Sequence, residues 1–486
     1  MKSIDLPPSA SALMESTRSI GYSLPAAVAD IIDNSVTAGA TSVEIKFMSE
    51  DKPYIVIADN GCGMTFEELK NAMQYGSHDP REARSEDDLG RYGLGLKTAS
   101  LSQCQVLSVI SKKDGIVSGC QWNLRHIRKE NTWSLLVLEI DEINSMPHVD
   151  FLEDKDSGTL VIWQELDRLL SPGDRQRDVL GARMIKVREH LSLVFHRYLS
   201  GKETERKLVI SMNCVDITPI DPFLSGQSTQ AMAEEVILVG DNEKVRVRPY
   251  ILPHISRLSS SDLKMLGGKD GLRRSQGFYV YRNKRLVVWG TWFRMMVKGD
   301  LSKLARIQVD IPNTLDDLWT LDIKKSVAIP PEDVQKNLRV IIDKIAEKSK
   351  QTWTYRGKKE RKTEKIEPWN RLKTRDGGFF YQINREHILI QKILELHPDL
   401  KRPLASLLSI IEERLPLNSL YVDMVQDEKI TNNDEQSEKA VLDQLIAILS
   451  IFPSPEAKAK ALSDFLLIPP FSDHFDYINK NIQKVL

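Results

Sequence analysis

The feature that most constrains this chain is an apolar run that ends abruptly in a carboxylate and glycines. Residues 54–58 have the sequence Tyr-Ile-Val-Ile-Ala, typical of a buried strand, and Asp59-Asn60-Gly61-Cys62-Gly63-Met64 follows at once. A carboxylate at a strand end can accept a hydrogen bond from an exocyclic amine such as that of adenine, and glycines let the backbone approach a flat ring. The alternative interpretation is an ordinary Asn-Gly turn.

A second motif lies on a predicted helix just before that strand. Residues 24–36 carry apolar side chains at helical spacing, with Ser23 as N-cap and Pro25 in the first turn. Asp30 and Asn34 are four residues apart, so they share one face of this helix. An amide oxygen can ligate Mg²⁺ and a carboxylate can polarise water, which suits a magnesium nucleotide. A solvated polar helix face is the alternative.

The third motif is a glycine-rich loop, Gly90-Arg91-Tyr92-Gly93-Leu94-Gly95-Leu96-Lys97-Thr98-Ala99-Ser100, which runs into a predicted helix. Free backbone N–H groups and a helix amino end favour phosphate binding, and Lys97 adds a positive charge. The spacing differs from the Gly-x-x-x-x-Gly-Lys-Ser/Thr loop and does not open a dinucleotide-binding unit. Taken by itself, such a glycine pattern is a weak signal.

The first third of the chain alternates between helical and strand patterns. A second helix is expected over residues 65–75, and further strands over residues 42–47, 106–111, 116–122, 135–140 and 159–163. Helices and strands mixed in this way predict an α+β sandwich, with a helical layer on one sheet.

The rest of the chain divides by composition. The 486 residues are about three times the ~150 residues of one domain. A second α+β block is expected over residues 169–345, with a helix over 184–199, a strand over 207–213 and a hairpin over 277–289. A basic linker is expected over residues 346–380 and a mainly helical region over 381–486, with its clearest helices at 388–396 and 441–449.

Charge, cysteines and hydropathy exclude several classes of protein. The net charge is −1, and the four cysteines form no Cys-x-x-Cys pair, so neither a disulfide framework nor a cysteine zinc site is expected. No apolar run reaches the ~18–20 residues of a membrane helix, and the amino terminus lacks the apolar stretch of a signal peptide. We therefore expect a cytoplasmic protein with no membrane partner.

Taken together, the three motifs resemble the GHKL ATPases, the group of gyrase, heat-shock chaperone, histidine kinase and MutL. The resemblance is closest to MutL around Asp33-Asn34-Ser35-Val36-Thr37-Ala38-Gly39-Ala40-Thr41 and Asp59-Asn60-Gly61-Cys62-Gly63, and to the MORC ATPases in Tyr92-Gly93-Leu94-Gly95-Leu96-Lys97. Ser157-Gly158-Thr159 resembles the family's Gly-Thr at the adenine pocket. This resemblance covers residues 10–165 and implies a GHKL (Bergerat) ATPase sandwich over residues 1–168.

The resemblance also implies roles for individual residues. Asn34 would hold Mg²⁺ at the phosphates and Asp59 would contact the adenine amine of ATP. Residues 74–92 would form a mobile lid. The expected nucleotide-binding residues are Asn34, Asp59, Gly61, Gly63, Met64, Gly90, Gly93, Leu94, Gly95, Leu96, Lys97, Thr98 and Thr159.

The expected general base departs from the family pattern. MutL and MORC proteins carry glutamate where this chain has Asp30, and Thr37 replaces an aspartate of MutL. Aspartate is one methylene shorter, and a misplacement of about 1 Å can cost on the order of a hundredfold in rate. We therefore expect slow hydrolysis, and a non-hydrolysing nucleotide-sensing scaffold is the alternative function.

The second block resembles the transducer domain of MutL, gyrase and MORC proteins, which supplies a lysine to the γ-phosphate. Lys324 and Lys325 are the candidates, with an exposed lysine pair as the alternative. The resemblance implies an ATP-dependent homodimer that acts as a clamp on DNA, with a partner nuclease or helicase, in restriction or anti-phage defence.

The basic residues 349–375 offer a possible nucleic-acid contact. This stretch carries many Lys and Arg residues together with Trp353, Tyr355 and Trp369, so it could neutralise phosphates and stack on bases. Glu360, Glu364 and Glu367 interleave with the cations, as on a solvated helix, which is the alternative.

Overall fold

The computed structural model describes residues 8–481 except 20, 77–94, 171–175, 205, 227–229, 240–242, 254–256, 300–301, 317–318, 320–329, 355–367, 374–378, 417–437 and 469. The chain forms two compact units, residues 1–355 and 356–486. No described helix has the length and apolar character needed to span a membrane.

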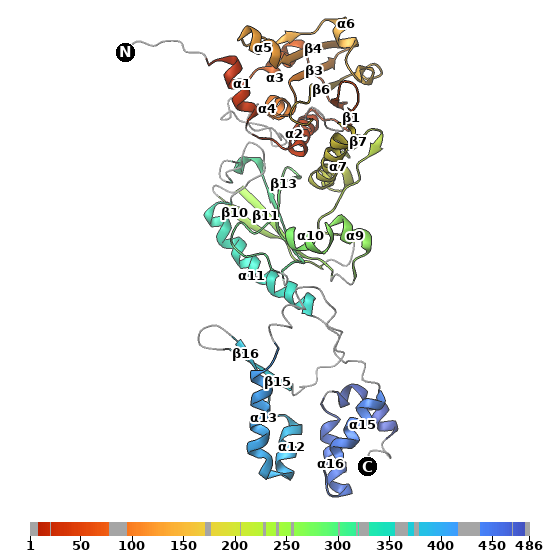
Figure 1. Ribbon diagram of the computed structural model, residues 1–486, viewed down its shortest axis with the longest axis vertical. Helices are drawn as coiled ribbons and strands as arrows, with labels where there is room; N and C mark the ends of the chain where they lie inside the picture. The colour runs from red at the N-terminus through yellow and green to blue at the C-terminus, as the bar shows by residue number, and fades with distance from the viewer. Residues whose placement is uncertain are drawn as a thin grey trace, which may run out of the picture. The chain divides into compact units, whose positions relative to one another are not determined.

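An eight-stranded mixed sheet forms the first half of the N-terminal unit, in the order β5-β4-β3-β6-β2-β1-β7-β8 (Figure 1). All neighbours are antiparallel except β1 and β7, which are parallel. The strands are β1 (Ser42–Met48), β2 (Tyr54–Asp59), β3 (Val106–Lys113), β4 (Ile116–Asn123), β5 (Leu136–Val137), β6 (Gly158–Gln164), β7 (Val209–Met212) and β8 (Val215–Asp216).

Both faces of the central strands are buried, which explains the unbroken apolar run of β2. Ile55 and Ile57 face the larger core, under the helical layer, whereas Val56 and Ala58 face a smaller core with α6 (Ile140–Asn144) and a 3₁₀ turn (Val149–Leu152). The helices on the larger-core side are α1 (Ala10–Arg18), α2 (Leu24–Thr37), α3 (Phe66–Met73), α4 (Gly95–Leu101) and α5 (Leu124–Glu130). The α+β sandwich expected from the sequence is confirmed.

One expected strand of this sheet is wrong at its carboxyl end. Of residues 135–140, only Leu136 and Val137 pair with β4, and the chain turns into α6 at Ile140. The reason is local, because Glu139 and Glu142 form a capping box that starts the helix.

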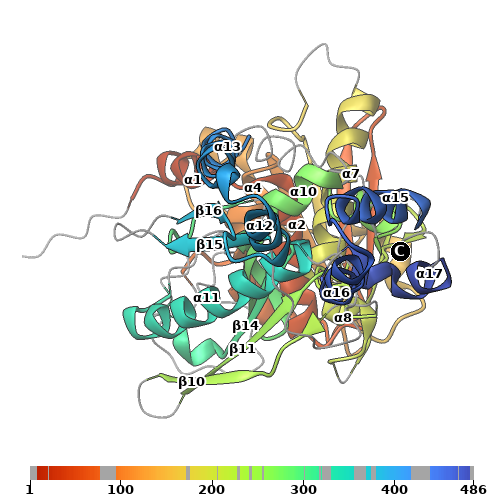
Figure 2. The same ribbon diagram turned by 90° about the horizontal axis from the view of Figure 1, so that it is seen from below.

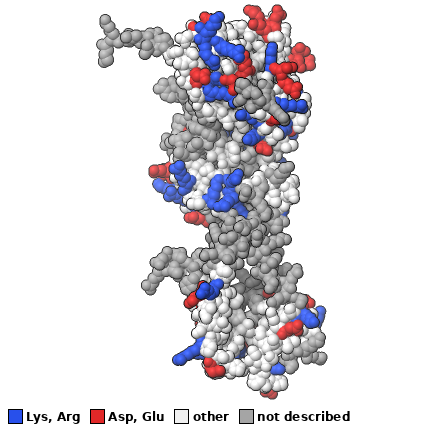
Figure 3. Space-filling view, viewed as in Figure 1, with Lys and Arg blue, Asp and Glu red and all other residues white. Residues whose placement is uncertain are grey.

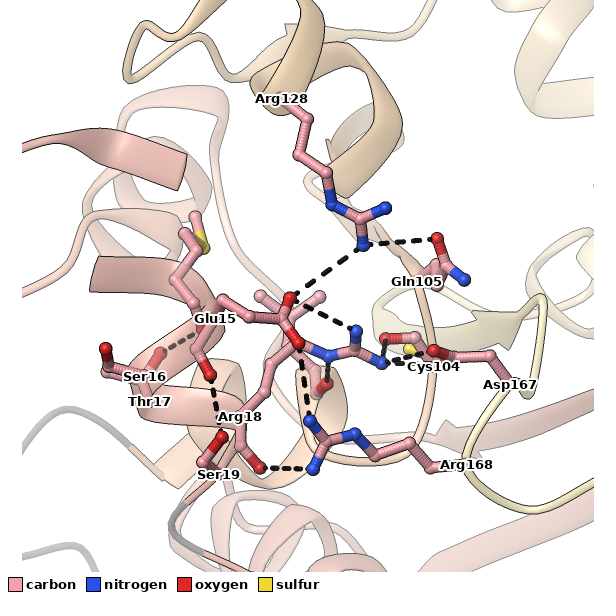
Figure 4. Close-up of polar contacts among 12 residues, drawn as sticks. Glu15, Ser16, Thr17, Arg18, Ser19, Cys104, Gln105, Arg128, Asp167 and Arg168 are labelled. Atoms are coloured by element: carbon pink, nitrogen blue, oxygen red, sulfur yellow. Dashed lines mark hydrogen bonds and ion pairs between the residues drawn. The ribbon is translucent and has the colours of Figure 1, made fainter. Parts of the chain in front are cut away.

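A buried arginine ties the end of α1 to the end of α4 (Figure 4). Arg18 is 2% exposed, and its Nε donates to the carbonyl oxygen of Leu101 at 2.7 Å. Its Nη2 donates to both carboxylate oxygens of Asp167 at 2.7 and 2.9 Å, and Arg168 donates back to the Arg18 carbonyl at 3.0 Å. Since Leu101 is the last residue of α4, this cluster fixes the far end of the helix that follows the glycine-rich loop.

A second sheet forms the other half of the N-terminal unit. Its strands run in the order β10-β11-β14-β12-β13, with β9 also paired to β11. They are β9 (Gln230–Ala231), β10 (Glu235–Val239), β11 (Glu243–Ile251), β12 (Gly277–Arg282), β13 (Arg285–Thr291) and β14 (Ala305–Ile311). The hairpin expected over residues 277–289 is confirmed, and Asn283 and Lys284 turn it with φ of 46° and 66°, as a type I′ turn requires.

Helices pack against the second sheet and connect it to α2. The long helix α11 (Glu332–Thr354) lies along β10, β11 and β14 and buries Val334, Leu338, Ile341 and Ile345 at helical spacing (Figure 2). In the other direction, α7 (Gln176–Val194) packs on α2 and on β13, and α8 (His196–Ser200) follows it. The short α9 (Ser260–Met265) and α10 (Gly268–Arg274) precede β12.

The first sheet extends beyond the domain boundary that the sequence suggested at residue 168. Residues 42–45 of β1 pair with residues 209–212 of β7, and β8 follows at the edge. Spacing along the chain gives no sign of this pairing, because about 165 residues separate the two strands in the sequence.

The C-terminal unit contains a hairpin and helices. Strands β15 (Trp369–Lys373) and β16 (Phe379–Ile383) pair antiparallel, so part of the expected basic linker is a strand. The first residues of the expected linker, 346–354, belong to the helix α11, which continues to Thr354. The helices are α12 (Ile388–Leu396), α13 (Lys401–Glu413), α15 (Glu438–Leu449), α16 (Pro455–Phe465) and α17 (Phe475–Lys480), and α15, α16 and α17 share an apolar core.

Candidate active site

The candidate site is formed by α2, the carboxyl end of β2 and the start of α4. The helix α2 begins as its sequence predicted, with Ser23 accepting from the backbone N–H of Ala26 and Pro25 in the first turn. It packs against both β2 and α4, so the polar face of α2, the strand end and the end of the glycine-rich loop are neighbours.

Asp59 is a buried carboxylate held by donors on two sides. Its side chain is 6% exposed; Ser35 Oγ donates to Oδ2 at 2.8 Å and the backbone N–H of Gly61 donates to Oδ1 at 2.9 Å. Burial raises the pKa of Asp59 above its usual value, while the hydrogen bonds from Gly61, Ser35 and Thr159 act to lower it. A carboxylate has about four acceptor positions, so these three bonds leave capacity for one further donor.

The backbone around Gly61 and Gly63, the two glycines after Asp59, leaves no room for a larger side chain. A Cβ on Gly63 would lie 1.9 Å from the carbonyl oxygen of Lys112, and the residue has a φ of +63°. A Cβ on Gly61 would lie 2.8 Å from Ala38 Cβ and 3.0 Å from Asp59 Oδ1. The segment is therefore a close backbone crossing between α2 and β3, beyond what a simple Asn-Gly turn needs.

Ser111 connects the two segments that the sequence assigned to the adenine pocket. Its Oγ accepts from the backbone N–H of Met64 at 2.8 Å, donates to the carbonyl oxygen of Gly158 at 3.0 Å and lies 2.9 Å from Thr159 Oγ1. Ser35 and Ser111 were both missed by the sequence analysis. A buried serine on an apolar strand is the one available signal for Ser111, and Ser35 has only its place beside Asn34.

Three of the polar side chains on α2 differ in exposure. Asp30 is 6% exposed, Asp33 is 1% exposed and Asn34 is exposed. Asp33 accepts from Arg285 Nε at 2.9 Å, so its carboxylate is paired with the second sheet. Asp30 and Asn34 lie one turn apart, as expected from their spacing.

Lys97 has partners that the sequence did not predict. Its ammonium group is buried and donates to the carbonyl oxygens of Ala72 and Gln74, both at 2.9 Å, at the carboxyl end of α3. Burial lowers the pKa of Lys97 to about 8. A phosphate contact by Lys97 would therefore compete with two carbonyl groups.

The remaining expected residues fall into two groups. Gly95, Leu96 and Thr98 lie in the first turn of α4 next to α2. Gly90, Gly93, Leu94, Lys324 and Lys325 lie outside the described residues, as does most of the expected lid over residues 74–92.

The donor set fits a nucleotide with a hard divalent cation. Mg²⁺ is usually bound through one or two protein oxygens together with substrate phosphates and water, and the exposed amide oxygen of Asn34 is such a ligand. The carboxylate of Asp30, one turn away, can accept a proton from water. Across the described residues no three His, Cys, Asp or Glu side chains are grouped as a metal site.

Comparison with known proteins decides the family of this domain. Residues 22–159, which include α2, the end of β2, the glycine-rich loop and Thr159, match the family described as histidine kinase-, DNA gyrase B-, and HSP90-like ATPase. These residues form a GHKL-type ATPase domain. The GHKL domain thus contains the elements that bring Asp30, Asn34 and Asp59 together.

Individual relatives match this chain over short stretches. The ATPase morc-1 of Caenorhabditis elegans is 32% identical over 93 residues, 19% of this chain and 10% of that protein. The DNA mismatch repair protein MutL of Thermoanaerobacter sp. (strain X514) is 28% identical over 96 residues, 19% of this chain and 15% of that protein. The match therefore spans a small part of either relative. The crystal structure of the N-terminal domain of a DNA repair protein has a TM-score of 0.40 and 16% identity over 69% of this chain and 96% of that one.

Proposed function

We propose that this chain binds Mg·ATP in its GHKL domain and hydrolyses it slowly. The observation that carries the proposal is Asp59, a buried carboxylate at a strand end with spare acceptor capacity, beside glycines that bring the backbone close. A desolvated carboxylate in such a place is costly unless a donor completes its hydrogen bonds, and the exocyclic amine of adenine is such a donor.

The other expected residues take roles around the phosphates. Asn34 would ligate Mg²⁺, which neutralises phosphate charge when bound. The backbone of Gly90, Gly93, Leu94, Gly95 and Leu96, with Thr98, would follow the phosphates, and Met64 and Thr159 would border the adenine. Asp30 would accept the proton of the attacking water. Lys97 would either contact phosphate or hold the carboxyl end of α3, as it does in this structure.

We expect slow turnover because the proposed general base, Asp30, has a short side chain. Aspartate in place of the family's glutamate moves the carboxylate back by one methylene, and a misplacement of about 1 Å can cost on the order of a hundredfold. The same residue favours the second candidate, a nucleotide-sensing scaffold that binds ATP and does not hydrolyse it.

We further propose a domain division into ATPase (1–168), transducer (169–345), linker (346–380) and helical C-terminal domain (381–486). The structure adjusts these bounds, because β7 and β8 join the ATPase sheet, α11 continues to Thr354 and β15 lies within the proposed linker. In this scheme ATP closes a homodimeric clamp, and Lys324 or Lys325 of the transducer reaches the γ-phosphate. Contacts between the second sheet and α2 support a transducer. Arg285 of the hairpin donates to Asp33 of α2, and α7 packs on both α2 and β13.

DNA is the proposed client of the clamp, with a partner nuclease or helicase in restriction or anti-phage defence. The name of the MutL relative supports DNA, whereas the described surface of the first-sheet end carries cations and anions interspersed (Figure 3). One cleft of about 850 Å³ on the second sheet has a mixed lining. Lys244, Arg246 and Arg248, alternate residues on one face of β11, line it together with Glu203, Glu234, Glu243 and Asp310, and Arg248 pairs with Glu234 at 3.0 Å. The cleft therefore adds no support for DNA.

Light scattering tests the clamp. With Mg²⁺ and a non-hydrolysable ATP analogue, the measured mass should rise from 55.3 kDa toward that of two chains, or a pre-existing dimer should become more compact. The same analogue with EDTA is the control, because Asn34 can then hold no cation. A mass and size that are unchanged by Mg²⁺ and analogue would contradict the clamp and favour the scaffold.

A further inference from the structure

A buried ion pair joins the second sheet to the helix of the ATP site. Arg285, the first residue of β13, donates from Nε to Asp33 Oδ1 at 2.9 Å, and the two side chains are 5% and 1% exposed. The two residues are 252 positions apart in the sequence, so this contact exists only because the β12–β13 hairpin reaches α2.

The arginine is held on several sides. Its guanidinium lies 4.7 Å from the ring centroid of Phe195, and Nη1 donates to the carbonyl oxygen of Leu286. His190 of α7 is half-buried nearby, and its pKa is lowered to about 3 by desolvation and by the Arg285 charge, against the opposite effect of Asp33. At neutral pH the guanidinium therefore faces the Asp33 carboxylate and an uncharged imidazole.

The position of Asp33 on α2 allows the ion pair to affect the two expected ATP-site residues of that helix, Asn34 and Asp30. Asp33 directly precedes Asn34 and follows Asp30 by three residues, and successive side chains on an α-helix are about 100° apart. Asp33 points toward β13 and α7, while Asn34 is exposed. Holding Asp33 therefore fixes the rotation of α2 about its axis, and with it the directions of Asn34 and Asp30.

We propose that Arg285 is a positioning residue for the ATP site: it holds Asp33 and thereby sets the orientation of Asn34 and Asp30. The inference rests on the proposed function of the GHKL domain. In this proposal the β12–β13 hairpin acts on the ATP site indirectly, through α2. This role is separate from that of the lysine that the transducer is expected to bring to the γ-phosphate. Any displacement of the second sheet would reach Asn34 through this pair.

The first test is hydrogen exchange without nucleotide in Arg285→Gln. The substitution removes the guanidinium charge that lies beside the buried Asp33 carboxylate, so the amides of α2 should exchange at least about tenfold faster, while those of β11 and β14 keep their protection. Exchange in α2 at the native rate would overturn the proposal.

The second test separates positioning from a general loss of stability. Arg285→Gln should weaken binding of Mg·ATP by about 10–100-fold, the range for residues that orient a metal ligand, and leave ADP binding in EDTA unchanged, since Asp59 is untouched. Arg285→Lys keeps the charge and should recover part of the loss. Equal losses of affinity for Mg·ATP and for ADP in EDTA would contradict a role of Arg285 through Asn34.

The matched control is Arg282→Gln on the same hairpin. Arg282 forms a comparably buried pair with Asp316 at 2.7 Å, within the second half of the N-terminal unit. It should destabilise that half without changing α2 exchange or the Mg²⁺ dependence. If Arg282→Gln matches Arg285→Gln in both readouts, the effect is structural and the proposal fails.

A double variant tests whether Arg285 acts through Asp33. Asp33→Asn with Arg285→Gln should lose no more Mg·ATP affinity than the worse single variant, because both changes break one contact. If the double variant loses Mg·ATP affinity by the product of the two single losses, Arg285 does not act through Asp33. A native chain that binds no nucleotide would overturn the proposed function and the role of Arg285 with it, whereas native binding that Arg285→Gln leaves unchanged would overturn the role of Arg285 alone.

Discussion

Asp30→Asn is expected to bind Mg·ATP like the native chain and to hydrolyse it about 10²–10⁴-fold more slowly, the usual effect of losing a general base. The amide keeps the size and polarity of the carboxylate but cannot accept a proton. Asp30 lies one turn from Asn34 on the same face of α2, and at 6% exposure its side chain is largely shielded from solvent. Single-turnover hydrolysis, measured beside equilibrium ATP binding, separates chemistry from affinity.

Asp30→Glu is the matched control for this prediction. Restoring the longer side chain of the family should keep turnover equal or raise it if reach limits the native site. Native-rate hydrolysis by Asp30→Asn would show that another group is the base. Asp33 is a poor substitute, because its carboxylate already accepts from Arg285 at 2.9 Å. If neither the native chain nor Asp30→Glu hydrolyses ATP, the nucleotide-sensing scaffold is the better account.

Asp59→Asn is expected to weaken ATP binding by roughly 10–150-fold, which corresponds to the loss of about 1.5–3 kcal/mol from a charge-assisted hydrogen bond. Inside the protein, Oδ1 accepts from the backbone N–H of Gly61, Oδ2 accepts from Ser35, and the backbone of Thr159 gives the carboxylate a third hydrogen bond. An amide has a single oxygen, which the backbone N–H of Gly61 would need, so the adenine amine would lose its acceptor. Isothermal titration with ATP measures the effect directly.

Ser35→Ala is the control for Asp59→Asn. It removes one donor to Asp59 Oδ2 but leaves both carboxylate oxygens as acceptors, so ATP affinity should fall by less than in Asp59→Asn. A circular dichroism melt must show that both variants are folded. Native ATP affinity in a folded Asp59→Asn chain would rule out the adenine assignment.

Local signals were sufficient where a few neighbouring residues decide the structure. Ser23 and Pro25 gave the start of α2, and Thr65 with Glu68 form the capping box at the start of α3. The apolar run before Asp59 gave β2, because a strand buried on both faces has apolar residues at every position. These segments carry the GHKL motifs, which is why the family could be predicted.

Contacts between distant segments could not be predicted in this way. Ser111 meets Met64 and Thr159 only through the register of β3 with β6, and Arg285 meets Asp33 only after both sheets have formed. Lys97 was assigned to phosphate from its charge, but burial and two carbonyl acceptors hold its ammonium group at α3. Packing against distant segments sets the direction of a side chain within a motif. The spacing of residues along the sequence therefore cannot predict that direction.

The central claim is that Asp59 selects an adenine nucleotide, and binding of ATP and GTP to the native chain at equal Mg²⁺ tests it most directly. Adenine presents an N–H donor at the position where guanine presents a carbonyl oxygen, which a carboxylate repels. Saturable ATP binding is expected, with GTP binding weaker by about tenfold or more, since a lost donor also leaves a buried acceptor unpaired. Equal binding of ATP and GTP, or no binding of either, would contradict it.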